Sequence, residues 1–206
     1  MLNYQRTIPT KLYFGKGQIS HLEEALKSFG KNVLLTYGGG SIKKIGLYDE
    51  VMKILNEGGF RVSELSGIDP NPRIESVAEG VRLCREQNID VILAVGGGST
   101  LDCSKAIAVG TYYEGDDMWK MVVNAEGIAE KALPLVTILT LSATGSEYDG
   151  GGVISNMNTN QKLGRSYTYP AVSICDPTYT FSVSPYQTAA GSADIMSHII
   201  EDYFSR

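Results

Sequence analysis

The chain has 206 residues, of which 43% are hydrophobic and 20% are charged, so it can bury a core and is not disordered. Its formal net charge of −5, without any long run of Lys and Arg, excludes nucleic acid and anionic membranes as general partners. The start resembles no signal peptide and no apolar run could cross a bilayer, so we expect a cytoplasmic protein. The three cysteines, Cys84, Cys103 and Cys175, lack metal-finger spacing, and we expect free, buried thiols.

The first half of the chain alternates short strands and helices. The pattern predicts a strand at 12–14, a helix at 18–29, a strand at 33–37, a helix at 48–57 and a strand at 60–65. A turn of sequence Asp-Pro-Asn-Pro follows at 69–72. The next helix, 74–87, is amphipathic, and its predicted buried face carries Ile74, Val77, Val81 and Cys84.

Apolar, β-prone runs continue the alternation at 91–95, 135–139 and 171–175. Strands that alternate with helices predict an α/β fold: a Rossmann-like, mostly parallel sheet with helices on both faces. In such a sheet, ligands bind outside the carboxyl ends of the strands. Three turns of small residues follow predicted strands at such ends, at 38–41, at 96–99 and from Thr140 onward.

The pattern changes near Ser182, where we place a domain boundary. Residues 1–182 are predicted to form the α/β domain, and 183–206 to begin a helical domain, with Ser184 as N-cap and Pro185 at the first helical position. Asp194 and His198 lie one helical turn apart and can point at one ion, although a solvated pair is the more common arrangement at this spacing. Because the helical pattern continues to the last residues, we expect the chain to be cut within a helix.

Two predicted strands run into the same sequence, Gly-Gly-Gly-Ser. We call 38–41 the first glycine turn and 96–99 the second glycine turn. Consecutive glycines before a helix present free backbone N–H groups and a positive helix end to a phosphate. One copy is also typical of a flexible turn, but two copies after strands favour a ligand with phosphates in two places. Neither a Walker loop nor a Gly-x-Gly-x-x-Gly motif is present.

Together these segments resemble the iron-containing alcohol dehydrogenases. The resemblance rests on Phe-Gly-Lys-Gly at 14–17, Asp-Pro-Asn-Pro at 69–72, Ala-Val-Gly-Gly-Gly-Ser at 94–99 with Asp102, residues 140–147, Asp-Pro at 176–177, and residues 191–201. The first glycine turn, with Lys43 and Lys44 after it, is similar to the NADPH-dependent branch of butanol dehydrogenases and aldehyde reductases. The family joins a dinucleotide-binding domain to an all-helical domain, and the chain would cover the first and the opening helix of the second.

The resemblance implies roles for individual residues. Gly97, Gly98 and Ser99 would hold the pyrophosphate, and Gly38, Gly39, Gly40 and Ser41 would face the adenosine ribose. The other implied cofactor-binding residues are Asn71, Asp102, Thr140, Leu141, Thr144 and Lys162. Relatives that use NAD carry an aspartate near the first glycine turn, and here small residues and two lysines leave room and charge for a 2′-phosphate. NADP(H) is therefore the expected cofactor, with NAD as the alternative.

Asp194 and His198 match the family's first two ligands of a divalent metal, iron or zinc, and are the implied catalytic residues. Such a metal polarises the carbonyl of a small aldehyde or activates the matching primary alcohol while hydride moves to or from the nicotinamide. A catalytic site needs about three protein ligands, so this chain is expected not to be a complete catalyst.

The resemblance also implies a homodimer. The alternatives are a relative of glycerol dehydrogenase or dehydroquinate synthase, and a nucleotide-binding module without turnover.

Overall fold

The computed structural model describes residues 3, 5, 7–124 and 131–205. Its centre is a six-stranded sheet in the order β1-β8-β5-β4-β2-β3, in which every neighbouring pair is parallel. The strands are β1 (Lys11–Phe14), β2 (Asn32–Tyr37), β3 (Arg61–Leu65), β4 (Val91–Gly96), β5 (Leu135–Leu139) and β8 (Val172–Cys175). The predicted α/β, Rossmann-like class is confirmed.

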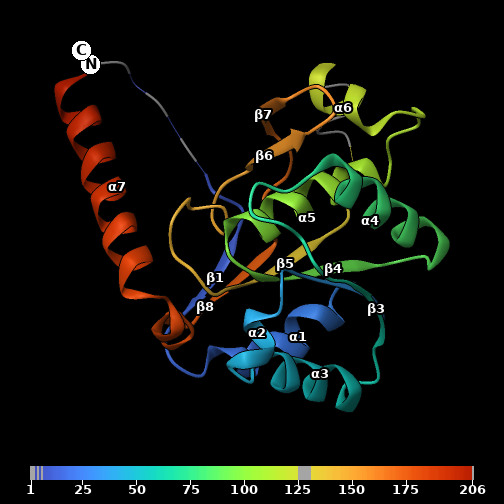
Figure 1. The fold of residues 1–206 in the computed structure, drawn as a ribbon. Coiled ribbons are helices and arrows are strands. Elements are labelled where there is room, and N and C mark those ends of the chain that lie inside the picture. The colour runs from blue at the N-terminus through green and yellow to red at the C-terminus, as the bar shows by residue number, and fades with distance from the viewer. Residues whose placement is uncertain (1–2, 4, 6, 125–130, 206) are drawn as a thin grey trace.

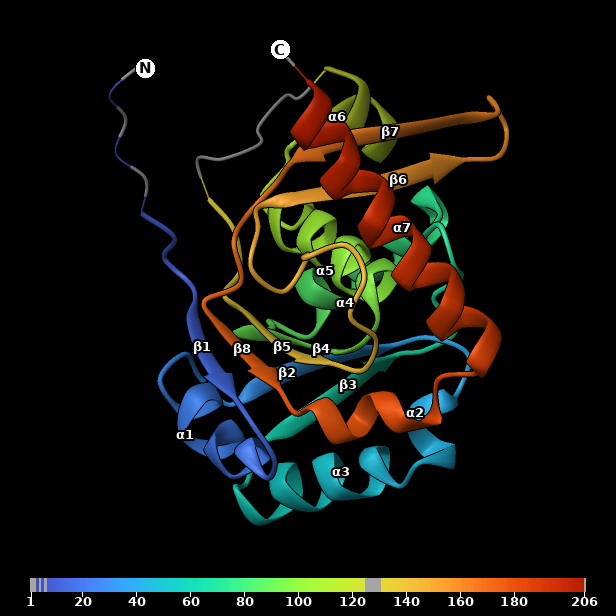
Figure 2. The same cartoon turned by 90° about the vertical axis from the view of Figure 1, so that its left-hand side faces the viewer.

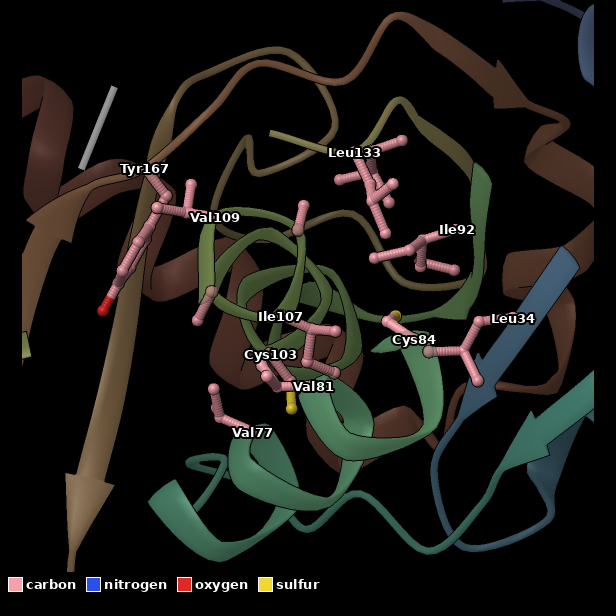
Figure 3. Packing of buried hydrophobic residues seen from close by; sticks show 14 of the residues in the cluster. Leu34, Val77, Val81, Cys84, Ile92, Cys103, Ile107, Val109, Leu133 and Tyr167 are labelled. Atoms are coloured by element: carbon pink, nitrogen blue, oxygen red, sulfur yellow. The ribbon is translucent and has the colours of Figure 1, made fainter. Parts of the chain in front are cut away.

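Helices cover both faces of this sheet (Figure 2). On one face lie α1 (Leu22–Lys27), α2 (Ser41–Lys44) and α3 (Leu47–Glu57), and on the other lie α4 (Ile74–Glu86), α5 (Gly98–Gly110) and α6 (Met118–Asn124). Successive side chains of a strand point to opposite faces, so Leu34 and Leu35 of β2 belong to two different cores. Figure 3 shows the first core, where Ile92 of the sheet packs with Val81 of α4 and Ile107 of α5.

The helix predicted at 18–29 is shorter in the structure. A 3-10 turn at Gln18–His21 precedes α1, which ends at Lys27. The predicted buried face of α4 is confirmed, since Ile74, Val77, Val81 and Cys84 are all buried. Cys175 is a correction: it is half-buried, because it ends the short strand β8 at the edge of a cavity, while Cys84 and Cys103 are buried as expected and all three thiols are free.

An antiparallel hairpin, β6 (Gly151–Asn156) and β7 (Gln161–Ser166), lies outside the main sheet and packs on α5. The sequence pattern does not reveal it. β6 begins with two glycines, and β7 is largely exposed and polar, so neither strand shows an apolar alternation. The pattern also does not predict α2 and α6, because both are short.

The last helix, α7 (Pro185–Phe204), begins as predicted, with the Ser184 hydroxyl accepting a hydrogen bond from the Gln187 N–H. It lies to one side of the sheet (Figure 1), and none of its residues is buried. Its apolar side chains Ile195, Ile199 and Tyr203 are 50%, 63% and 80% exposed. Among the helices in the described part of the chain, none is both long and apolar enough to span a membrane.

Candidate functional site

The three turns of small residues meet at the carboxyl edge of the parallel sheet. The first glycine turn follows β2, the second follows β4, and Thr140 follows β5, the three strands lying side by side. The Thr140 N–H donates to the Gly96 carbonyl at 3.0 Å, and the Gly67 N–H donates to the Gly38 carbonyl at 3.2 Å. The sequence therefore placed these turns correctly on one edge, where α/β proteins bind ligands.

The second glycine turn opens directly into α5. Its N-cap, Gly97, provides no side-chain hydrogen bond, so no capping side chain satisfies the first N–H groups of this 13-residue helix. A Cβ on Gly98 would lie 2.6 Å from the Thr144 hydroxyl oxygen, and one on Gly97 would contact Leu141. The 140–150 loop thus lies against an uncapped helix N-terminus, an arrangement suited to an anion.

Three predicted residues from distant segments are linked by hydrogen bonds beside this turn. Asn71 adopts a left-handed conformation, with φ +58°, between Pro70 and Pro72. Its N–H donates to the Ser99 hydroxyl at 3.2 Å, and its side-chain oxygen accepts from the Lys162 ammonium at 2.6 Å. All three side chains belong to one polar wall of the site, which β7 reaches through Lys162.

The first glycine turn is open. Nothing lies within 4 Å of a Cβ built on Gly39 or on Gly40, so the backbone there has free space around it. The Lys43 ammonium lies over the rings of Tyr37 and Tyr48, at 5.2 Å and 4.5 Å from their centroids. The hydrogen bond with Tyr37 raises the pKa of Lys43.

Asp102 occupies the first part of α5, but both its carboxylate oxygens already accept hydrogen bonds within the protein. Oδ1 accepts from the Ser146 hydroxyl at 2.7 Å, and Oδ2 accepts from the Val153 N–H at 2.9 Å. Burial raises the pKa of Asp102, while these two hydrogen bonds act against the rise. The geometry indicates that Asp102 fixes the 140–150 loop and β6 to α5.

The sequence reasoning missed Lys105 and Asp149. Lys105 is fully buried one helical turn beyond Asp102 and forms an ion pair of 2.8 Å with Asp149, in the 140–150 loop. A signal was present for Lys105, since it is the only charged residue in the otherwise small and apolar stretch 103–110. Nothing in the sequence pattern pairs it with Asp149, which lies 44 residues away.

The predicted metal ligands are on the solvent-exposed helix α7. Asp194 Oδ1 and His198 Nε2 are 3.8 Å apart, and their side chains are 65% and 69% exposed. Within the residues that the structure describes, no group of three or more His, Cys, Asp or Glu residues could hold a metal ion. Two donors are fewer than a catalytic iron or zinc requires, so the described residues do not by themselves fit the metal.

A cavity of about 400 Å³ separates α7 from the 140–150 loop. Leu141 and Ser142 line one side, and Thr188, Gly191 and Ile195 of α7 line the other. Neither Asp194 nor His198 lines this cavity. The helix that carries the two candidate ligands therefore borders the loop, but the structure does not bring the ligands themselves to the glycine turns.

An α/β sheet with two glycine turns at its carboxyl edge is an arrangement typical of nucleotide-binding proteins, and comparison with known proteins identifies the family. Residues 9–177 match the model of the iron-containing alcohol dehydrogenase family. The chain belongs to this family, and the resemblance seen in the sequence is confirmed.

Individual relatives agree with this assignment. The whole chain is 55% identical to part of NADH-dependent butanol dehydrogenase A of Clostridium acetobutylicum and 40% identical to part of NADPH-dependent aldehyde reductase YqhD of Escherichia coli; it covers 53% of each. The crystal structure of NADH-dependent butanol dehydrogenase A from Thermotoga maritima superposes with a TM-score of 0.91 at 44% identity, over 98% of this chain and 51% of that one. The chain thus spans about half the length of the curated relatives it matches.

Proposed function

We propose that this chain provides the NADP(H)-binding site of an alcohol dehydrogenase that interconverts small primary alcohols and aldehydes. The observation that carries the proposal is the uncapped N-terminus of α5, framed by the second glycine turn and the 140–150 loop. A pyrophosphate satisfies the free N–H groups of such a helix and is stabilised by the helix dipole. Membership of the iron-containing alcohol dehydrogenase family supports the choice of reaction.

Each predicted residue has a place in this proposal. Gly97, Gly98 and Ser99 hold the pyrophosphate, and Thr140, Leu141 and Thr144 form the facing wall. Asn71 and Lys162, joined to each other and to Ser99, supply polar groups at the side of the cofactor. Asp102 acts on the cofactor site indirectly, because its carboxylate oxygens accept hydrogen bonds from Ser146 and Val153.

The preference for NADP(H) over NAD(H) is supported by the first glycine turn. Residues 38–41 carry no carboxylate to accept from the ribose hydroxyls, and the space around Gly39 and Gly40 is open. Residues 38–41 themselves therefore oppose a 2′-phosphate with neither a negative charge nor a steric barrier. The names of the relatives point both ways, to NADH for the butanol dehydrogenase and to NADPH for the aldehyde reductase.

The bound nicotinamide would supply or accept the hydride. The residues of this chain bind and orient the dinucleotide and shield it on the side of the 140–150 loop. Asp194 and His198 would contribute two ligands to the family's metal, but the described residues do not complete such a site. We therefore infer that the described residues bind the nucleotide without completing the catalytic site.

Titration of the purified chain with NADPH and with NADH, followed by nucleotide fluorescence, tests the proposal. We expect saturable binding of both nucleotides, tighter for NADPH. Absence of saturable binding of either one would overturn the cofactor assignment. Mixing the chain with NADPH, butanal and Zn²⁺ or Fe²⁺ tests the inference of an incomplete catalytic site. Turnover at an ordinary enzymatic rate would contradict this inference.

We also propose that the chain forms a homodimer through the edge of its sheet. β1 is the terminal strand, and its side chains Leu12 and Phe14 are 44% and 70% exposed. An exposed apolar edge strand is suited to pairing with another strand. Light scattering coupled to size-exclusion chromatography tests this, with a monomer at all concentrations as the contradicting result.

A further inference from the structure

The start of α5 is tied to the 140–150 loop at two neighbouring points. Asp102 receives hydrogen bonds from Ser146 and Val153. One turn further along, the Lys105 ammonium donates to Asp149 Oδ1 at 2.8 Å and to the Gly151 carbonyl at 2.7 Å. Asp102 of α5 thus holds the two ends of the segment 146–153, and Lys105 of the same helix holds its middle.

Only one partner of the Lys105–Asp149 pair is buried in the interior. The Lys105 side chain has no solvent exposure, whereas that of Asp149 is 42% exposed. Burial lowers the pKa of Lys105, but the hydrogen bond and charge of Asp149 and the charge of Asp102 oppose this fall. A buried ammonium is costly without a partner, so the structure depends on Asp149 staying where it is.

The glycines after Asp149 explain how the backbone comes so close to Lys105. A Cβ on Gly150 would lie 2.9 Å from the ring of Tyr169, and one on Gly152 would lie 3.1 Å from the ring of Tyr167. The same Gly152 Cβ would lie 3.4 Å from the Cα of Asp102. Larger side chains would push this segment away from α5 and separate Lys105 from the Gly151 carbonyl.

The 140–150 loop is also the wall of the proposed pyrophosphate site, since Thr144 and Leu141 contact the positions of Gly98 and Gly97. We propose that Lys105 and Asp149 form a positioning ion pair, which holds this loop against the second glycine turn and thereby sets the affinity for the pyrophosphate and nicotinamide half of the cofactor. The inference rests on the proposed nucleotide-binding function. Neither residue touches the nucleotide, and both act through the loop.

The test measures two ligands on each variant by calorimetry. NADPH spans both glycine turns, whereas 2′-AMP carries only the adenosine end and does not need the 140–150 loop. Asp149→Asn and Lys105→Met should each raise the Kd of NADPH about tenfold, because binding must then position a loop that has lost one charge-assisted hydrogen bond to α5. The Kd of 2′-AMP should change less than about twofold, because the first glycine turn is untouched.

The double variant K105M/D149N is decisive, because it buries no unpaired charge and remains informative even if D149N fails to fold. Two residues that act as a pair predict the same loss of NADPH affinity in the double variant as in either single variant. The matched control is Glu79→Gln, which removes an exposed ion pair with Arg82 on α4 and should change neither Kd.

Three results would overturn the inference: an unchanged NADPH Kd in the folded double variant, equal weakening of NADPH and 2′-AMP, or losses that multiply in the double variant. Failure of the proposed function is distinguishable, because the unmodified chain would then not bind NADPH at all.

Discussion

Introduction of a carboxylate into the first glycine turn should reverse the preference between the two nicotinamide nucleotides. Gly39 is the suitable position, because it is exposed and nothing lies within 4 Å of a Cβ built there, so Gly39→Asp fits without strain. Unit charges 4 Å apart interact by about 1 kcal/mol in water and about 4 kcal/mol near a protein surface. For an exposed aspartate facing a 2′-phosphate, we expect a penalty of about 2 kcal/mol, or about thirtyfold in Kd.

The assay is a fluorescence titration of wild type and variants with NADPH and with NADH. The G39D substitution should weaken NADPH binding about thirtyfold and should leave NADH binding equal or slightly tighter, since the carboxylate accepts from the free ribose hydroxyls. Gly39→Asn is the matched control, because it has the same size without the charge and should leave the ratio of the two Kd values within about threefold of wild type. Equal effects of G39D on both nucleotides would refute the assignment of the 2′-phosphate to this turn.

Three further predictions concern the glycine turn, the thiols and a buried carboxylate. Gly98→Ala should weaken NADPH binding at least about tenfold, because the added Cβ displaces Thr144. The double variant G98A/T144A should recover the thermal stability that G98A loses. Unchanged NADPH binding in G98A would contradict the close contact. Burial raises the pKa of Cys84 and of Cys175 to about 11 and that of Cys103 to about 12. Iodoacetamide at pH 8 should therefore alkylate the folded protein far more slowly than the urea-unfolded chain. Mass spectrometry that shows Cys175 modified equally fast in both states would refute this. Burial acts to raise the pKa of Asp176, but hydrogen bonds from Thr178 and from the Gly17 N–H outweigh burial and hold this pKa below its ordinary value. The Asp176 carboxylate therefore stabilises the fold above about pH 4, and this stabilisation is lost as the pH falls through the folded-state pKa. Asp176→Asn should lower the free energy of unfolding at pH 7 by about 1 to 3 kcal/mol, with a difference that shrinks towards pH 3, and a pH-independent difference in urea melts would contradict the account.

The middle of the sheet could be predicted because β2, β4 and β5 are apolar on both faces. Val33, Leu34 and Leu35 are all buried, and so are Val91, Ile92 and Leu93, as expected for parallel strands covered by helices on each side. The glycines that end β2 and β4 then placed the two turns on one edge. Local pattern was sufficient for this part of the site.

The rest of the site depends on contacts between distant segments. Asn71 and Lys162 are 91 residues apart, and only the resemblance to a family placed them together. Gly150 and Gly152 look like a flexible linker in the sequence, yet each makes room for a tyrosine ring. The Lys105–Asp149 pair could not be predicted, because no local pattern reports which carboxylate reaches a buried lysine.

A crystal structure of the chain with NADP⁺ tests the central claim most directly. We expect the pyrophosphate at the N–H groups of Gly98 and Ser99, the 2′-phosphate at residues 38–41, and the nicotinamide half beside the 140–150 loop. Nucleotide bound instead in the apolar cavity of about 470 Å³ that Leu12, Phe14 and Cys175 help to line, with the second glycine turn empty, would contradict it.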